Sequence, residues 1–261
     1  MLEVDYKKNC TGCSACANIC PRGCIRMTAD CEGFLYPEVN EEQCMDCGLC
    51  ENVCPMLQKP KQHELVAVYG AKNRDDAVRF TSSSGGMFTL LAEEVLRQGG
   101  VVAGVALDEK LAVRHVLVDN VDDLFKLRGS KYVQSEIGTI YREVRQQLLA
   151  GKKVLFSGTP CQIAGLKGYL VKPFANLLTV DVVCHGVPSP RVYHKHLAEL
   201  GEEAGEPVVQ VRFRDKAKGW KSGETLFLTE HQRFGASKRQ ETYMRLFLNN
   251  ISIRPSCGEC A

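Results

Sequence analysis

The sequence predicts two parts of unequal size, a small α+β module followed by a larger α/β domain with a mixed sheet. Two observations predict this division. Ten of the fourteen cysteines lie before residue 55, in two runs of the same spacing. After a polar segment at 55–64, strand-type and helix-type apolar patterns alternate to the end of the chain. The length of 261 residues is sufficient for both parts. We therefore expect one domain at 1–58 and a second at 65–261.

Each cysteine run has the spacing C-x₂-C-x₂-C-x₃-C-P, with Pro21 or Pro55 at its end. This is the spacing of bacterial proteins that hold two [4Fe–4S] clusters, in which the fourth cysteine of each run binds the other cluster. The spacing therefore predicts a ferredoxin-like module with two crossed ligand sets. The first set is Cys10, Cys13, Cys16 and Cys54, and the second is Cys44, Cys47, Cys50 and Cys20.

Disulfides and zinc are the alternative uses of so many cysteines. Disulfides require an oxidising compartment, and the opening residues MLEVD lack the basic start and apolar run of a secretion signal. Zinc sites usually pair two C-x₂-C units across a longer gap. The sequence therefore favours iron–sulfur clusters in a reduced, cytoplasmic protein. Cys24 and Cys31 exceed the eight ligands, and we expect them to pack as small apolar side chains.

Charge and hydropathy argue against two kinds of partner. The formal net charge of +2 is too small to indicate nucleic acid or an anionic membrane. No apolar run approaches the ~20 residues that a membrane-spanning helix needs. We expect neither nucleic-acid binding nor direct membrane insertion.

Within the first module, short elements are expected around the cysteine loops. Residues 2–6 are predicted to form a strand and residues 15–20 a short helix. Strand-type residues at 24–27 and 34–39 flank a turn at 30–33, which predicts a hairpin. Because the second cysteine run then repeats the first, the module is an internal duplication.

In the second part, the apolar periodicity predicts strands and helices in alternation. The glycine pairs and single glycines that follow the apolar stripes mark the ends of helices, as at Gly99 and Gly151. Strands are expected at 65–71, 101–107, 112–118, 153–157, 177–183, 208–213 and 225–229, and helices at 87–98, 136–150, 162–170, 190–200 and 241–249.

Three short segments of this domain have residues suited to an anionic or planar ligand. A serine- and glycine-rich turn before a helix offers hydroxyls and free N–H groups to a phosphate, although such turns more often only cap the helix. A serine, lysine and tyrosine in sequence suit a phosphate or a stacked ring. The third segment follows a buried strand, at the sheet edge where α/β folds place ligands. These candidates are Ser82, Ser83, Ser84, Gly85 and Gly86; Ser130, Lys131 and Tyr132; and Gly158, Thr159 and Pro160.

The last four cysteines are candidates for one more metal centre. Cys161 and Cys184 each follow a predicted strand, and Cys257 and Cys260 form a C-x₂-C pair. One more [4Fe–4S] cluster requires four thiolate ligands, which is the number that these cysteines supply. Zinc, or unrelated free thiols, are the alternatives that the long sequence gaps leave open.

Five segments of the chain together resemble the beta subunits of coenzyme F420 hydrogenases and dehydrogenases, with their relatives the F420H2 oxidases and the 7-hydroxymethyl chlorophyll a reductases. They are SSSGGMF at 82–88, LRGSKYVQS at 127–135, VLFSGTPCQ at 154–162, DVVCHGVPS at 181–189 and RPSCGEC at 254–260. The resemblance implies FAD beside the iron–sulfur clusters, with the three segments above in contact with the flavin. It also implies that Cys161, Cys184, Cys257 and Cys260 hold a cluster.

The resemblance implies an oxidoreductase in which the flavin exchanges a hydride with F420 or a similar organic substrate and single electrons with the clusters. A redox partner protein or electron-carrier subunit is expected. Two alternatives are an electron-transfer subunit without flavin and a flavin-dependent reductase of another substrate. The sequence identifies no catalytic acid or base. Relatives continue past the final C-x₂-C pair, so we expect the chain to be truncated after Ala261.

Overall fold

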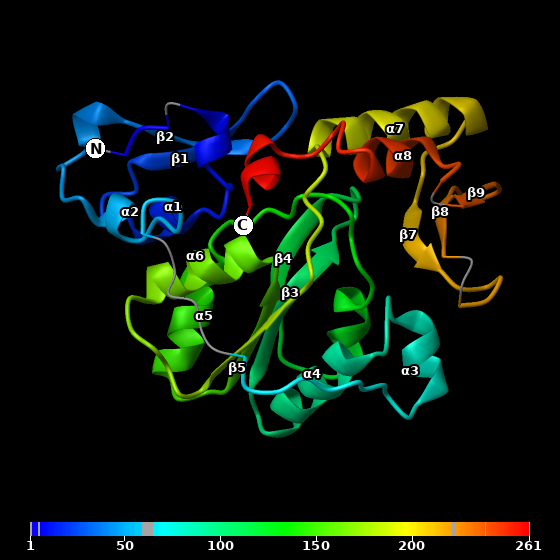
Figure 1. Ribbon diagram of the computed structural model, residues 1–261, viewed down its shortest axis with the longest axis horizontal. Coiled ribbons are helices and arrows are strands. Elements are labelled where there is room, and N and C mark those ends of the chain that lie inside the picture. Colours follow the sequence, from blue (N-terminus) through cyan, green and yellow to red (C-terminus); the bar gives the residue numbers. More distant parts are fainter. Residues whose placement is uncertain (1, 5, 59–64, 221–222, 238, 261) are drawn as a thin grey trace.

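The computed structural model describes residues 2–4, 6–58, 65–220, 223–237 and 239–260. Its strands form three sheets of two, four and three strands (Figure 1). The four-stranded sheet contains both parallel and antiparallel pairs, which confirms the predicted class of a ferredoxin-like module followed by an α/β domain with a mixed sheet. No helix within the described ranges is both long and apolar enough to cross a membrane.

The N-terminal module is built on a hairpin between its two cysteine runs. Strands β1 (Ile25–Ala29) and β2 (Leu35–Val39) pair antiparallel. Helix α1 (Ala15–Ile19) contains Cys16 of the first run, and α2 (Leu49–Asn52) contains Cys50 of the second run. The expected strand at 2–6 is wrong for the described residues 2–4, which have no regular structure.

The central sheet has the strand order β4-β3-β5-β6. Strands β3 (Val101–Leu107) and β4 (Val113–Val118) are antiparallel, whereas β3 pairs parallel with β5 (Val154–Gly158), and β5 pairs parallel with β6 (Leu177–Asp181). Because successive residues of a strand face opposite sides, Phe156 packs in the core with α5 (Ile140–Leu149) and α6 (Pro160–Leu170). Leu155 packs on the other face with α4 (Met87–Arg97).

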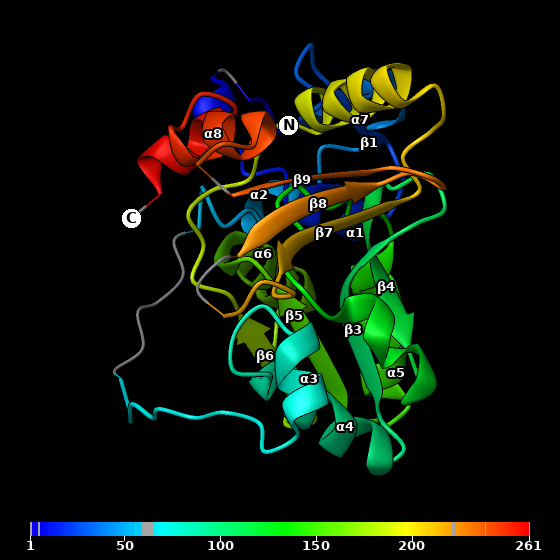
Figure 2. The ribbon, with the colours of Figure 1, turned by 90° about the vertical axis from the view of Figure 1, so that its right-hand side faces the viewer.

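The remaining strands and helices of the larger domain form a second layer. Strands β7 (Gln210–Asp215), β8 (Glu224–Leu228) and β9 (Arg233–Ser237) form an antiparallel sheet. Helices α7 (Pro190–Ala204) and α8 (Thr242–Leu248) pack against it, and Figure 2 shows them along the same side as the N-terminal module. Strand β9 and the short helix α3 (Asp76–Thr81) are not predicted from the sequence.

The expected strand at 65–71 is wrong. Described residues in this range have no strand, and the apolar side chains of Leu65, Val66 and Val68 are exposed. A strand requires backbone partners as well as strand-type residues. Two residues after this range, the backbone N–H of Asn73 donates to the Gly85 carbonyl at 2.7 Å.

Candidate metal and cofactor sites

The first cysteine set lies around a loop that ends in α1. The Cys13 side chain is buried, and Cys16 is almost fully buried. Burial raises the pKa of Cys16, and so do the negative charges of Cys13, Cys10 and Cys54. Cys54 affects the pKa of Cys10 in the same direction. The structure therefore brings the fourth cysteine of the second run to the first run, as the crossed spacing predicts.

The two cysteine loops have the same local geometry. The N–H of Gly12 lies 3.4 Å from the Cys10 sulfur, and the N–H of Asp46 lies 3.4 Å from the Cys44 sulfur. Each loop then passes through a left-handed residue, at Ser14 or Gly48, directly before its helix. N–H groups aimed at a ligand sulfur stabilise its negative charge. This matched geometry supports the internal duplication.

The second cysteine set lines one pocket between the hairpin and the second loop. Cys20 comes from the end of the first run, and Cys44, Cys47 and Cys50 come from the second. Cys24 also lines this pocket, with its sulfur 3.3 Å from the sulfur of Cys20. Cys24 is buried as expected for a packing residue, but it lies beside the predicted ligands. Cys31, the other surplus cysteine, is exposed rather than packed as expected.

The last four cysteines converge from three separate parts of the chain. Cys161 lies in the first turn of α6, directly after β5, and Cys184 follows β6. Because β5 and β6 are parallel, their carboxyl ends meet at one sheet edge. Partial desolvation raises the pKa of Cys184 to about 11, and the negative charges of the other cysteines act in the same direction; these are Cys161, Cys257 and Cys260.

Backbone contacts hold the terminal C-x₂-C pair beside Cys184. Pro188 and Ile253 form an antiparallel bridge, and the N–H of Ser189 donates to the Ser252 carbonyl at 2.7 Å. The 3₁₀ helix Pro255–Glu259 then begins. A Cβ at Gly186 would lie 3.4 Å from the Cβ of Cys257. The two loops are therefore in direct contact.

The spacing of the sulfur atoms separates zinc from a cluster. A tetrahedral zinc site with Zn–S bonds of about 2.3 Å requires its sulfurs to lie about 3.8 Å apart. In the described part of the chain, no three cysteine sulfurs lie within 4.8 Å of one another. The cysteine sets therefore fit a larger metal group, such as a [4Fe–4S] cluster, better than a single zinc ion.

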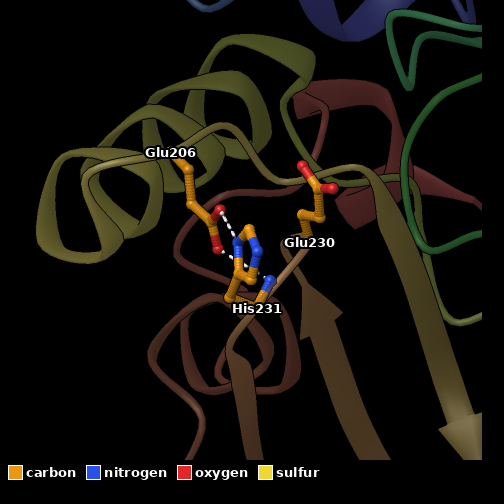
Figure 3. Close-up of side chains that lie close together, drawn as sticks. All are labelled: Glu206, Glu230 and His231. Carbon is orange, nitrogen blue, oxygen red and sulfur yellow. Dashed lines mark hydrogen bonds and ion pairs between the residues drawn. The ribbon is translucent and has the colours of Figure 1, made fainter.

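The described residues do contain one tighter group of possible metal ligands, Glu206, Glu230 and His231 (Figure 3). Glu206 already accepts hydrogen bonds from the Thr229 hydroxyl, from the His231 N–H at 2.9 Å and from the His231 ring at 2.7 Å. These bonds lower the pKa of Glu206 to about 2. They join the segment that follows α7 to the turn between β8 and β9. This structural role explains why the three side chains lie together without a bound metal.

The serine-rich turn lies at the start of α4, next to the segment at 128–131. The Ser83 hydroxyl accepts from the N–H of Ser130 at 2.6 Å, which joins two of the three predicted cofactor segments. Ser82 is buried and its hydroxyl donates to Val78, whereas Ser84 is exposed. Gly85 lies against the Ala71 carbonyl, and a Cβ at Gly86 would lie 3.1 Å from Asn73.

Two predicted cofactor residues have contacts within the fold. The Lys131 ammonium donates to the carbonyls of Val105, Lys126 and Arg128 at 2.7–3.0 Å, and burial lowers its pKa to about 7. The Tyr132 ring packs edge-on against Phe213 in the core of the second layer. Both residues therefore help to fix the loop that carries Ser130.

The third predicted segment lies beside the last cysteine set. Thr159 and Gln162 form a capping box at the start of α6, with Pro160 in its first turn. The Thr159 hydroxyl is 3.1 Å from the Cys161 sulfur. Gly158 is the last residue of β5. No hydrogen bond among the described residues joins this segment directly to the serine-rich turn, so the three segments form two groups.

Two basic side chains, Lys216 and Arg128, lie beside the serine-rich turn. The buried Lys216 ammonium donates to the carbonyls of Ser82 and Arg79, and it lies 3.6 Å from the centre of the Trp220 ring. Arg128 donates to Thr89 at 3.2 Å, in the first turn of α4. A site with these cations and free N–H groups suits an anionic group such as a phosphate. No local sequence signal identifies Lys216, because the turn lies more than a hundred residues earlier in the chain.

Three family models match parts of the chain. Family models match at residues 9–57 for a 4Fe-4S dicluster domain, at 68–141 for the N-terminal part of the coenzyme F420 hydrogenase/dehydrogenase beta subunit, and at 151–261 for its C-terminal part. No curated protein matches the sequence.

Among solved structures, the chain is similar to one in the F420-reducing [NiFe] hydrogenase complex from Methanosarcina barkeri, with 18% identity and a TM-score of 0.47. The match covers 72% of this chain and 63% of that chain.

Proposed function

The chain belongs to the coenzyme F420 hydrogenase/dehydrogenase beta subunit family, and from this premise we propose that it is an iron–sulfur flavoprotein oxidoreductase. It passes electrons between [4Fe–4S] clusters and FAD, and it exchanges a hydride with coenzyme F420 or a similar organic substrate. Clusters carry single electrons, and a flavin converts between one- and two-electron transfer. We assign two clusters to residues 1–58, and the third cluster and the flavin to residues 65–261.

The single observation that carries this proposal is the convergence of twelve cysteines into three sets of four. Each set draws its members from at least two separate segments, which a random distribution of free thiols would not produce. Cys13 of the first set packs against α6, where a Cβ at Gly165 would lie 2.9 Å from its sulfur. Cys161 of the last set begins the same helix. The first and last sets are therefore neighbours, and the negative charge of Cys161 acts on Cys13.

The flavin part of the proposal rests on the serine-rich turn and its cations. Ser83, Ser130 and the start of α4 offer hydroxyl and N–H groups, and Lys216 and Arg128 provide positive charge. We propose that this turn binds the flavin pyrophosphate and that Gly158 and Thr159 lie toward the ring system, beside the last cysteine set. The residues present fit such a ligand, and they hold and orient it without a catalytic acid or base.

The test is the cofactor content of the anaerobically purified full chain. We expect about twelve iron atoms per chain, four for each cluster, and one FAD released on denaturation. Iron near eight with no flavin would instead identify an electron-transfer subunit with two clusters.

The organic substrate needs a separate assay. With the cofactors present, reduced F420 should be oxidised when an artificial electron acceptor is supplied. Full cofactor content without this activity would remove F420 from the proposal and would favour a flavin-dependent reductase of a different organic substrate. In both cases we propose that the protein acts in the cytoplasm with a redox partner protein.

A further inference from the structure

Arg254 is a completely buried side chain that joins three parts of the chain. Its guanidinium donates to the Cys10 carbonyl at 2.8 Å, to the Leu35 carbonyl at 3.0 Å and to the Gln134 side-chain oxygen at 2.9 Å. Its exposed fraction is 0%. The guanidinium also lies 4.2 Å from the centre of the Tyr36 ring. Arg254 is therefore held in one position by both the N-terminal module and the central domain.

The three acceptors of Arg254 are neutral groups. A buried cation is costly unless a negative charge lies near it, and carbonyl and amide oxygens supply only partial charge. An arginine in such a position requires a counter-charge from another source. The immediate neighbours of Arg254 indicate where that charge lies.

Arg254 lies between two of the proposed cluster sites. On one side, a Cβ at Gly12 would lie 2.7 Å from its Nη1 atom, and Gly12 is in the loop between Cys10 and Cys13. On the other side, Arg254 caps the 3₁₀ helix Pro255–Glu259, and its carbonyl accepts from the N–H of Cys257 at 2.9 Å. Figure 1 shows this terminal segment between the N-terminal module and the central domain.

We propose that Arg254 is the shared counter-charge of the first and third clusters and that it raises the reduction potentials of both. The inference rests on the proposed cluster sites. Four thiolates give a cluster net negative charge, and reduction adds one more negative charge. A fixed cation stabilises the reduced form more than the oxidised form, and net charge and hydrogen bonding are known determinants of cluster potential. Burial strengthens the effect because little solvent screens the charge.

A second arginine between the two parts of the chain provides a matched control. Arg142 of α5 donates to the carbonyls of Ala17 and Asn18 at 2.9 Å, so it also joins the central domain to the first cysteine loop. Unlike Arg254, Arg142 is exposed. Solvent should screen its charge, and Arg142→Met should change the cluster potentials much less than Arg254→Met.

The experiment is a potentiometric titration of the full chain monitored by EPR. In Arg254→Met, two of the three midpoint potentials should shift to lower values, and the third should stay at its wild-type value. The unshifted signal should be the one that Cys47→Ser removes, because Cys47 belongs to the second set. Arg254→Lys, which keeps the charge, should shift the same two potentials less.

Gln134→Glu tests the charge without removing the arginine. A carboxylate in place of the amide that accepts from Arg254 should neutralise its field and lower the same two potentials, even if Arg254→Met does not fold. Unchanged potentials, equal shifts of all three, or shifts to higher values in the loaded variants would overturn the inference. A wild-type protein with fewer than three potentials would instead contradict the proposed function.

Discussion

At the scale of single residues, Gly12 shows how closely the first cysteine loop is fitted to the rest of the chain. Its φ is +70°, a left-handed conformation that favours glycine, and a Cβ there would collide with Arg254 and with Gln134. Gly48, directly before the helix of the second loop, has the same φ, and no atom of the described residues lies within 4 Å of its missing Cβ. Comparing substitutions at the two glycines therefore separates the cost of a left-handed backbone from the cost of steric overlap.

We expect Gly48→Ala to destabilise the protein by about 1–2 kcal/mol, from the left-handed backbone alone. Gly12→Ala should cost about 1–3 kcal/mol more, because it also overfills a packed contact. Thermal unfolding and iron content of the two variants measure this difference. Equal losses in both variants would show that Arg254 does not pack against the first loop as described.

His115 predicts a pH dependence of stability. It is buried, stacks on Phe156 and lies 3.1 Å from the Ser135 hydroxyl and 3.2 Å from the Ser157 carbonyl. Burial lowers its pKa from 6.5 to about 4. The unfolded chain therefore binds a proton at higher pH than the folded chain, and stability is lost as the pH falls from about 6.5 toward 4. The full loss is about 3 kcal/mol.

The measurement is the urea unfolding of wild type and His115→Gln at pH 7.5 and pH 5.5. Wild type should lose about 1 kcal/mol more than the variant over this interval. The difference between the two proteins removes any acid sensitivity that they share. Parallel losses would mean that His115 is protonated equally in the folded and unfolded states.

The cysteines and the buried cations differ in how far the sequence could predict them. The spacing of Cys10 to Cys20 and of Cys44 to Cys54 is a local pattern set by the geometry of one loop, so it is readable from the sequence. Arg254 and Lys216 act on partners more than a hundred residues away. An isolated arginine or lysine has no local signal for such a contact, and surface exposure is its ordinary outcome.

At the scale of elements, α6 connects the two parts of the chain. Its start carries Cys161, and its body contains two glycines that face the N-terminal module. A Cβ at Gly168 would lie 2.4 Å from the Val53 carbonyl, and one at Gly165 would touch Cys13. Because glycine has no side chain, α6 can approach the cysteine loops closely at these two positions. This close approach explains why glycines occur inside the helix, where they are otherwise unfavourable.

Gly168→Ala should therefore destabilise the protein by about 1–3 kcal/mol, because backbone must move to admit the methyl group. Gly201→Ala in α7 is the control, since its Cβ would make only an ordinary contact at 3.4 Å. That change should be neutral or stabilising by up to about 1 kcal/mol. Melting temperatures of the two variants check the prediction, and a harmless Gly168→Ala would contradict the close approach of α6.

Strands of the central sheet could be predicted because they are buried on both faces. The runs that form β3 and β5 are almost continuously apolar. Residues 65–71 have similar composition but no partner strand, so the same pattern gave a wrong prediction there. Helix α3 was missed because it is short, although Asp75 caps it by accepting from the N–H groups of Ala77 and Val78.

At the scale of the whole molecule, side-chain and backbone contacts fix the N-terminal module on the central domain. Asn18 donates to the Gly138 carbonyl at 2.9 Å, and the N–H of Arg191 donates to the Glu32 carbonyl at 3.2 Å. Sequence patterning could predict two parts but not these contacts, which depend on how the parts dock. The division at 1–58 and 65–261 stays a prediction, and the fixed docking gives it a functional meaning. The docking holds the proposed cluster sites of the two parts in fixed positions relative to each other.

The central claim is that the last four cysteines hold a third cluster, next to the first. The most direct measurement is the iron and sulfide content of anaerobically purified wild type and of the double variant Cys257→Ser/Cys260→Ser. We predict that iron falls from about twelve to about eight atoms per chain, the loss of one four-iron cluster, while the two N-terminal clusters keep their EPR signals. Equal iron in the two proteins would contradict the claim.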